Sequence, residues 1–180
     1  MEPLSSSEMM RVVFNTMFSG PYEPWLPLGV AIILFGTAAW DARTGIVPNI
    51  PLLIGAIVII AGRFLAKGFP DAILHLAMGL GVWALCWAFN EFWYRFFQKD
   101  AIGMGDAKWT ALAAATFGVL PSILAWFIGS WVAIIWIGLS YVIGKRIRKV
   151  YFAPFLFCGL VIGLFFTKKI IELPYPYNFF

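Results

Sequence analysis

Residues 121–143, PSILAWFIGSWVAIIWIGLSYVI, form a run of 23 residues without a charged side chain. The hydrocarbon core of a bilayer is about 30 Å thick, and a helix needs about 20 residues to cross it. This run therefore predicts a membrane-spanning helix. The composition of the whole chain agrees, because 62% of its 180 residues are hydrophobic and 12% are charged, whereas soluble domains carry about 25% charged residues.

Similar apolar runs lie on both sides of this stretch. The spans that we expect are residues 25–40, 50–65, 69–89, 108–120, 121–143 and 152–167. The predicted fold is thus all-α, a polytopic membrane protein with about six transmembrane helices. The fourth run is short and polar at its start, so we expect its beginning at the interface or facing a cavity. Residues 118–122, which contain a glycine and a proline, predict a tight turn before the fifth run.

One membrane domain is expected, covering residues 25–167. Residues 1–24 are expected to lie at the interface as an amphipathic segment. They lack the basic start and the small-residue cleavage site of a secretory signal, so we expect them to be retained. Residues 168–180 are expected to form a short carboxyl tail.

The distribution of basic residues predicts an orientation. The gaps after the first, third and fifth runs hold eight Lys and Arg, and the two ends together with the gap after the second run hold five. Cytoplasmic loops are enriched in Lys and Arg. We therefore expect both termini outside and the odd-numbered gaps in the cytoplasm, with the cluster between Lys145 and Lys149 as the main anchor.

The net charge of +4 does not indicate nucleic-acid binding, because the basic residues lie between apolar runs and form no patch with stacking aromatics. Their expected partner is membrane lipid. The sequence leaves the oligomeric state open.

We expect no metal and no cofactor. The two cysteines, Cys86 and Cys158, each lie inside an apolar run and form no CxxC pair. The one histidine, His75, has no cluster of His and Glu around it, and a structural zinc or a catalytic metal needs such a ligand set. A structural hydrogen bond is the expected role of His75.

Two aspartates are candidates for chemistry, because each borders an apolar run on the predicted cytoplasmic side. Asp41 closes the first run and Asp106 opens the fourth. Ionisable groups at membrane depth are costly and are functional candidates by default. Each also has a structural interpretation: Asp41 pairs with Arg43 at the interface, or Asp106 caps a helix.

The segments around these acids resemble a known family. The stretch DARTGIVPN, which runs from Asp41 to Pro48 and Asn49, is similar to the first catalytic segment of the type IV prepilin peptidases. The stretch GMGDAK, from Gly103 through Gly105 and Asp106 to Lys108, resembles their second segment, the GxGD element of a wider group of membrane aspartic peptidases.

A third, weaker element of the family resembles Ala153-Pro154-Phe155 in the last run. The absence of CxxC motifs and of an added domain makes the chain similar to the short form of the family. The resemblance implies proteolysis without methyl transfer. It also implies a precursor substrate of prepilin type, with a short basic leader at the cytoplasmic face of the inner membrane followed by an apolar helix.

The resemblance makes Asp41 and Asp106 the expected catalytic pair. Two carboxylates hydrolyse a peptide when one is ionised and activates water while the other is protonated and donates to the carbonyl oxygen. Asp41 is expected at the carboxyl end of a helix and Asp106 at an amino end, with Lys108 nearby. The helix dipole then predicts that Asp106 is the partner more often ionised.

The other motif residues are expected to support this pair. Gly103 and Gly105 are predicted to allow a sharp turn and the close approach of another chain, such as the substrate. Pro48 and Asn49 are predicted to end the loop after Asp41 and to start the second run, with Asn49 as the helix cap.

Two other classes of protein share some of these features. A presenilin-like or signal-peptide-peptidase-like intramembrane protease also carries GxGD, but Pro48-Asn49 and the Ala-Lys after Asp106 favour the prepilin type. A small proton-coupled transporter with an acid relay is the other alternative, and the lack of detectable inverted symmetry argues against it.

Overall fold

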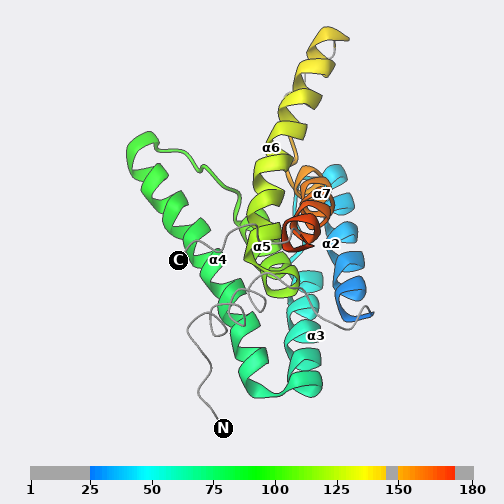
Figure 1. Ribbon diagram of the computed structural model, residues 1–180. Helices are drawn as coiled ribbons and strands as arrows, with labels where there is room; N and C mark the ends of the chain where they lie inside the picture. The colour runs from blue at the N-terminus through cyan, green and yellow to red at the C-terminus, as the bar shows by residue number, and fades with distance from the viewer. Residues whose placement is uncertain (1–24, 145–149, 173–180) are drawn as a thin grey trace, which may run out of the picture.

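The computed structural model describes residues 25–144 and 150–172, which form six α-helices (Figure 1). The helices are α2 (Trp25–Thr44), α3 (Asn49–Lys67), α4 (Phe69–Phe97), α5 (Met104–Phe117), α6 (Val119–Val142) and α7 (Ala153–Glu172). The expected interfacial segment 1–24, the cluster between Lys145 and Lys149, and the tail beyond residue 172 lie outside the described residues.

The all-α membrane fold is confirmed. Four helices of the described chain, α2, α3, α4 and α6, are long and apolar enough to cross a bilayer, and α7 contains the shorter apolar stretch Ala153–Thr167. The shortest described helix is α5, whose 14 residues extend about 21 Å at 1.5 Å per residue. The protein is thus a multi-pass membrane protein in which α5 is too short to span alone.

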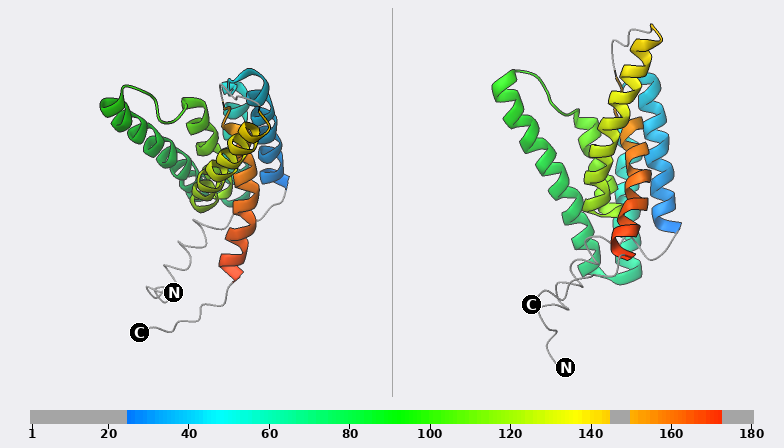
Figure 2. Two further views of the ribbon diagram at one scale, coloured as in Figure 1. Left: turned by 90° about the horizontal axis from the view of Figure 1, so that it is seen from above. Right: turned by 45° about the horizontal axis from the view of Figure 1, so that its top comes forward.

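The short helix α5 occupies the middle of the bundle and contacts α2, α3, α4, α6 and α7 (Figures 1 and 2). Nearly every residue from Ala107 to Phe117 is buried. The main hydrophobic core therefore forms around α5, with Trp109 and Leu112 packed against Leu34 and Leu52. A helix enclosed in this way does not need to reach both faces of the membrane.

Two glycines separate consecutive helices at the end of the bundle opposite the aspartates. Gly68 has a φ of 86° and Gly118 a φ of 95°, and residues with a side chain rarely adopt such values. The expected turn over residues 118–122 is therefore one residue long, and Pro121 lies in the first turn of α6, where proline is tolerated.

Helix α4 is longer than the sequence predicts, since it continues past residue 89 to Phe97. Its extension carries the ion pair between Glu91 and Arg95, 3.3 Å apart at i,i+4 spacing, which suits an exposed helix. Charged residues end an apolar run but do not end a helix. In two views, α4 diverges from α3 with distance from their common turn at Gly68 (Figures 1 and 2).

Helices α6 and α7 pack with their backbones close together. A Cβ atom on Gly129 would lie 2.8 Å from the Phe155 carbonyl oxygen, and one on Gly159 would lie 2.8 Å from the Gly129 nitrogen. Small residues allow this approach between membrane helices. The contact fixes α7, whose first residue reaches the candidate site.

Candidate active site

Asp41 lies in the last turn of α2 and is 5% exposed. The helix ends three residues later, at Thr44, because Gly45 has a φ of 71° and its N–H donates a 2.8 Å hydrogen bond to the Asp41 carbonyl oxygen. This is the left-handed glycine that commonly ends a helix. Among the described residues no ion pair joins Asp41 to Arg43, so the interpretation of Asp41 as an interfacial partner of Arg43 is not supported.

Asp106 lies in the first turn of α5, on the opposite side of the same site. The helix cap position is Gly103, and no side chain caps this end. Asp106 therefore does not serve as the helix cap, which was its structural interpretation. Its carboxylate instead folds back over Gly103, where an added Cβ atom would lie 3.1 Å from the Asp106 Oδ2 atom.

Both aspartates line one cavity of about 380 Å³. The lining comes from three parts of the chain: the end of α2 with the loop that leads into α3, the start of α5, and the segment before α7. The lining residues are Asp41, Gly45, Ile46, Val47, Asn49, Gly103, Gly105, Asp106, Lys108, Val150, Tyr151 and Phe152. The fold thus brings two acids that are far apart in the sequence to the same cavity.

Burial and the negative charge of Asp41 raise the pKa of Asp106 from 3.8 to about 7. Although the Asp106 side chain keeps some contact with the cavity, the protein packed around it disfavours its charged form. The expected helix-dipole effect is at most about 1 kcal/mol, which is less than one pKa unit. The pKa of Asp106 is thus shifted in the direction opposite to the one that the helix dipole predicts, because burial outweighs the dipole.

Asp41 has a hydrogen-bond donor of its own. The Ala153 backbone N–H, at the start of α7, donates to the Asp41 carboxylate. A donor of this kind stabilises a negative charge. The two acids therefore have different environments: a backbone N–H donates to the Asp41 carboxylate, whereas burial and the charge of Asp41 act on Asp106.

The two sequence segments that carry the acids are joined directly. An added Cβ atom on Gly105 would lie 2.9 Å from Val47 Cβ, and Lys108 Nζ donates a 3.0 Å hydrogen bond to Asn49 Oδ1. The predicted close approach at Gly105 is thus made by the loop of the same chain. Asn49 is the first residue of α3 with Pro48 at the cap position and no side-chain cap bond, so the expected capping role of Asn49 is wrong.

Gly103 has a φ of −65°, which any residue adopts, so the sharp turn expected at Gly103 does not require glycine. What glycine supplies there is space for the Asp106 carboxylate. Pro48 has extended backbone at the end of the loop, as the residue before a helix commonly does.

Helix α5 is further held by buried hydrogen bonds that sequence reasoning did not identify. Trp109 is fully buried, and its Nε1–H donates 3.1 Å to the Leu34 carbonyl oxygen of α2. Thr110 donates 2.8 Å to the Asp106 carbonyl oxygen and accepts 2.8 Å from the Trp126 indole N–H. Nothing in the spacing of the nine Trp residues indicated that Trp109 and Trp126 form hydrogen bonds inside the bundle and are not interface anchors.

Two other lining residues, Gly45 and Tyr151, were not singled out from the sequence. Gly45 has a positive φ, and a Cβ atom there would collide with the Tyr151 ring. Tyr151 lies before α7 and closes one side of the cavity. The weak third sequence element, Ala153-Pro154-Phe155, was the one feature of the sequence that indicated this region. Ala153, its first residue, donates its backbone N–H to Asp41.

His75 belongs to a separate polar cluster at the other end of the bundle. Its Nδ1 atom lies 2.8 Å from the Ala115 carbonyl oxygen near the end of α5. Arg63 bonds Asp71 at 3.2 Å across the turn between α3 and α4. The described residues contain no group of His, Cys, Asp and Glu that could hold a metal ion, and the structural hydrogen bond predicted for His75 is confirmed.

These features define a class of protein: a multi-pass helical membrane protein with two aspartates facing one cavity at one end of the bundle. Comparison with known families refines the class, because the type IV leader peptidase family matches residues 28–139. The match covers more than half of the chain and includes both aspartates, so the protein belongs to the type IV leader peptidase family. It is accordingly a peptidase. No curated protein and no solved structure matches the chain.

Proposed function

We propose that the protein is an aspartic endopeptidase of the prepilin type, with Asp41 and Asp106 as the catalytic pair. The observation that carries the proposal is the shared cavity, in which the charge of Asp41 acts on the pKa of Asp106. Carboxyl pairs whose environments separate their protonation states are typical of acid–base hydrolysis.

The arrangement supports one division of labour. Asp106, in its neutral form, donates a proton to the oxygen of the scissile carbonyl. Asp41, in its ionised form, accepts a proton from the water that attacks the carbonyl carbon. The result is a tetrahedral diol, and return of a proton to the amine breaks the C–N bond. Asp41 supplies the proton that the amine receives, and Asp106 accepts a proton from a hydroxyl of the diol as the new carboxylic acid forms, so each aspartate returns to its starting protonation state.

The proposed substrate is a prepilin-like precursor with a short basic leader and an apolar helix. Both aspartates lie at helix ends, Asp41 in the last turn of α2 and Asp106 in the first turn of α5. This position supports cleavage at the bilayer surface, where a leader meets its apolar helix, over cleavage in the middle of a membrane helix by a presenilin-like protease. The excess of basic residues on this side favours the cytoplasmic face of the inner membrane.

Cleavage of a prepilin-like precursor by the purified, reconstituted protein tests the proposal. We expect Asp41→Asn and Asp106→Asn each to lower the rate about a hundred- to ten-thousandfold, the range for losing a general acid or base. Asp100→Asn is the matched control, because Asp100 is exposed and bonds Asn90 outside the cavity. Undiminished cleavage by either of the first two variants would contradict the catalytic pair.

A further inference from the structure

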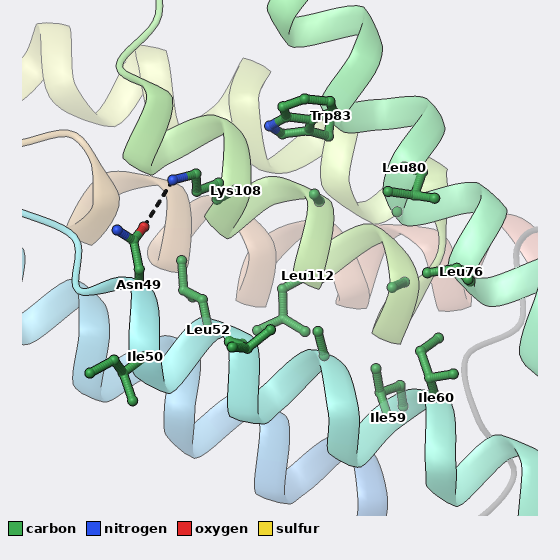
Figure 3. A pocket seen from close by; sticks show the side chains of 15 residues that line it. Asn49, Ile50, Leu52, Ile59, Ile60, Leu76, Leu80, Trp83, Lys108 and Leu112 are labelled. Atoms are coloured by element: carbon green, nitrogen blue, oxygen red, sulfur yellow. Dashed lines mark hydrogen bonds between the residues drawn. The ribbon is translucent and has the colours of Figure 1, made fainter.

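An apolar groove of about 520 Å³ runs along the bundle beside the candidate active site. Its walls are α3 and α4 and its floor is α5 (Figure 3). Leu80 and Leu76 of α4 face Ile59, Ile60 and other apolar residues of α3 across it. The groove exists because α4 leans away from α3 above their common turn (Figures 1 and 2).

The groove opens at the catalytic cavity. Asn49 and Lys108, joined by their 3.0 Å hydrogen bond, line both the groove and the cavity of Asp41 and Asp106. They are the polar end of an otherwise apolar surface, as Figure 3 shows. A chain that lies in the groove therefore arrives at the two aspartates as soon as it passes this pair.

The shape of the groove suits a helix. From Asn49 to Ile60 its α3 wall covers eleven residue steps, about 17 Å at 1.5 Å per residue, which is roughly half of a bilayer core. Small side chains line it, Ala56 on the α3 wall and Ala111 and Ala115 on the α5 floor, and small residues let a second helix approach closely in a membrane.

We propose that this groove holds the apolar helix of the precursor, with the bond to be cut placed beyond Asn49 and Lys108. The inference rests on the proposed function and names where that substrate binds. The leader then lies past the cavity, outside the groove, and the helix runs from the catalytic end toward Leu76. Specificity for precursors that carry an apolar helix follows from this surface, while the aspartates act on the peptide bond alone.

A pair of matched variants tests the groove. Leu80 lines it and is 55% exposed, whereas Leu85 is on the same helix, is 70% exposed and lines neither the groove nor the cavity; the two side chains point about 140° apart. We expect Leu80→Trp to raise KM for a helix-bearing precursor about tenfold by narrowing the groove. Leu85→Trp should leave KM unchanged.

A second substrate separates groove binding from chemistry. A short peptide that spans the cleavage junction but lacks the apolar helix should be cut equally by the wild type, Leu80→Trp and Leu85→Trp. Equal KM values for the precursor in both Trp variants would overturn the groove, as would an equal loss on the short peptide in Leu80→Trp.

Photo-crosslinking measures binding without cleavage. A photoreactive phenylalanine analogue at position 80, in an Asp106→Asn protein, should capture the precursor, and the same analogue at position 85 should not. Lipid adducts alone at position 80, with precursor present, would show that acyl chains fill the groove and would overturn the proposal. If the precursor is captured at position 80 but the wild type does not cut it, the proposed function is contradicted and the groove is supported. A failure of the proposed function is therefore distinguishable from a failure of the groove.

Discussion

Gly105 has no side chain because the loop that follows Asp41 occupies the space where one would be. Val47 packs against its backbone, and Asn49, two residues later, bonds Lys108 one turn further along α5. The glycine therefore determines how closely the segment that carries Asp106 approaches the segment that carries Asp41. The geometry of the pair depends on the absence of one carbon atom.

Gly105→Ala should lower cleavage of a precursor about tenfold or more, because its Cβ would lie 2.9 Å from Val47 Cβ and a misplacement near 1 Å costs about a hundredfold in rate. The measurement is kcat/KM in reconstituted membranes, with the amount of folded protein determined in parallel. Gly36→Ala is the control, since among the described residues no packing neighbour lies within 4 Å of its added Cβ. Similar activity in the two variants would refute the role given to Gly105.

The pH dependence of the reaction should follow the Asp106 carboxyl. Its pKa is raised to about 7, first by burial and then by the charge of Asp41. Because the proposed acid must be protonated, kcat should fall as pH rises through about 7. Infrared spectra should show the protonated Asp106 band at pH 6 and its loss by pH 8.

The two causes of this shift are separable. In Asp41→Asn the charge is removed and the burial remains, so the Asp106 band should disappear at a lower pH than in the wild type but still above pH 3.8. An Asp106 carboxyl that is already ionised at pH 5 in the wild type would contradict the assignment of the proton.

At the scale of secondary-structure elements, α5 is placed by its neighbours rather than by its own length. It contacts five other helices, and the Trp109 indole ties it to the Leu34 carbonyl of α2, two turns before Asp41. Asp106 lies three residues before Trp109 on the same helix. The bond to Leu34 therefore fixes the position of Asp106 relative to α2, which carries Asp41. Trp109 is a positioning residue in this sense.

Trp109→Phe keeps most of the ring and removes the N–H that bonds Leu34. We expect kcat to fall several-fold and the high-pH limb of the activity profile to shift, because Asp106 then sits differently relative to Asp41. Loss of one neutral hydrogen bond costs about 1 kcal/mol of stability, so the protein should remain folded. Trp136→Phe, at a site 56% exposed, is the control, and an unshifted pH profile in Trp109→Phe would argue against positioning.

At the scale of the whole molecule, the helices alternate in direction, so that the helix ends that carry the candidate site residues lie at one end of the bundle. Asp41 and Asp106 lie at the same end of the bundle as the start of α7, and Gly68 and Gly118 turn the chain at the other end. The charge distribution predicts that the aspartate end faces the cytoplasm.

This orientation is testable by cysteine labelling in cells, after replacement of Cys86 and Cys158 by alanine. Phe69→Cys, next to the Gly68 turn, should react with a membrane-impermeant maleimide added outside. Ala101→Cys, in the exposed segment between α4 and α5, should react after the membrane is permeabilised and not before. The opposite pattern would place the active site outside and would contradict the cytoplasmic leader.

The sequence alone predicted the features that depend on local composition. Long apolar runs predicted the boundaries of the helices to within a few residues. The exception is the charged extension of α4, where the apolar run ends before the helical hydrogen bonding does. The two motifs identified Asp41, Asp106 and the residues that surround them, because each motif is short and contiguous.

The tertiary structure decided what depends on neighbours from distant parts of the chain. Val47 occupies the space beside Gly105, Lys108 bonds Asn49, and Ala153 reaches Asp41, and none of these contacts is local. The pKa of Asp106 departs from the helix-end expectation for the same reason, since desolvation arises from all the atoms packed around a carboxyl, whereas a helix dipole acts within one turn. The sequence by itself identified the two acids that we propose as the pair; their surroundings, which only the packing sets, determined the shift in the pKa of Asp106.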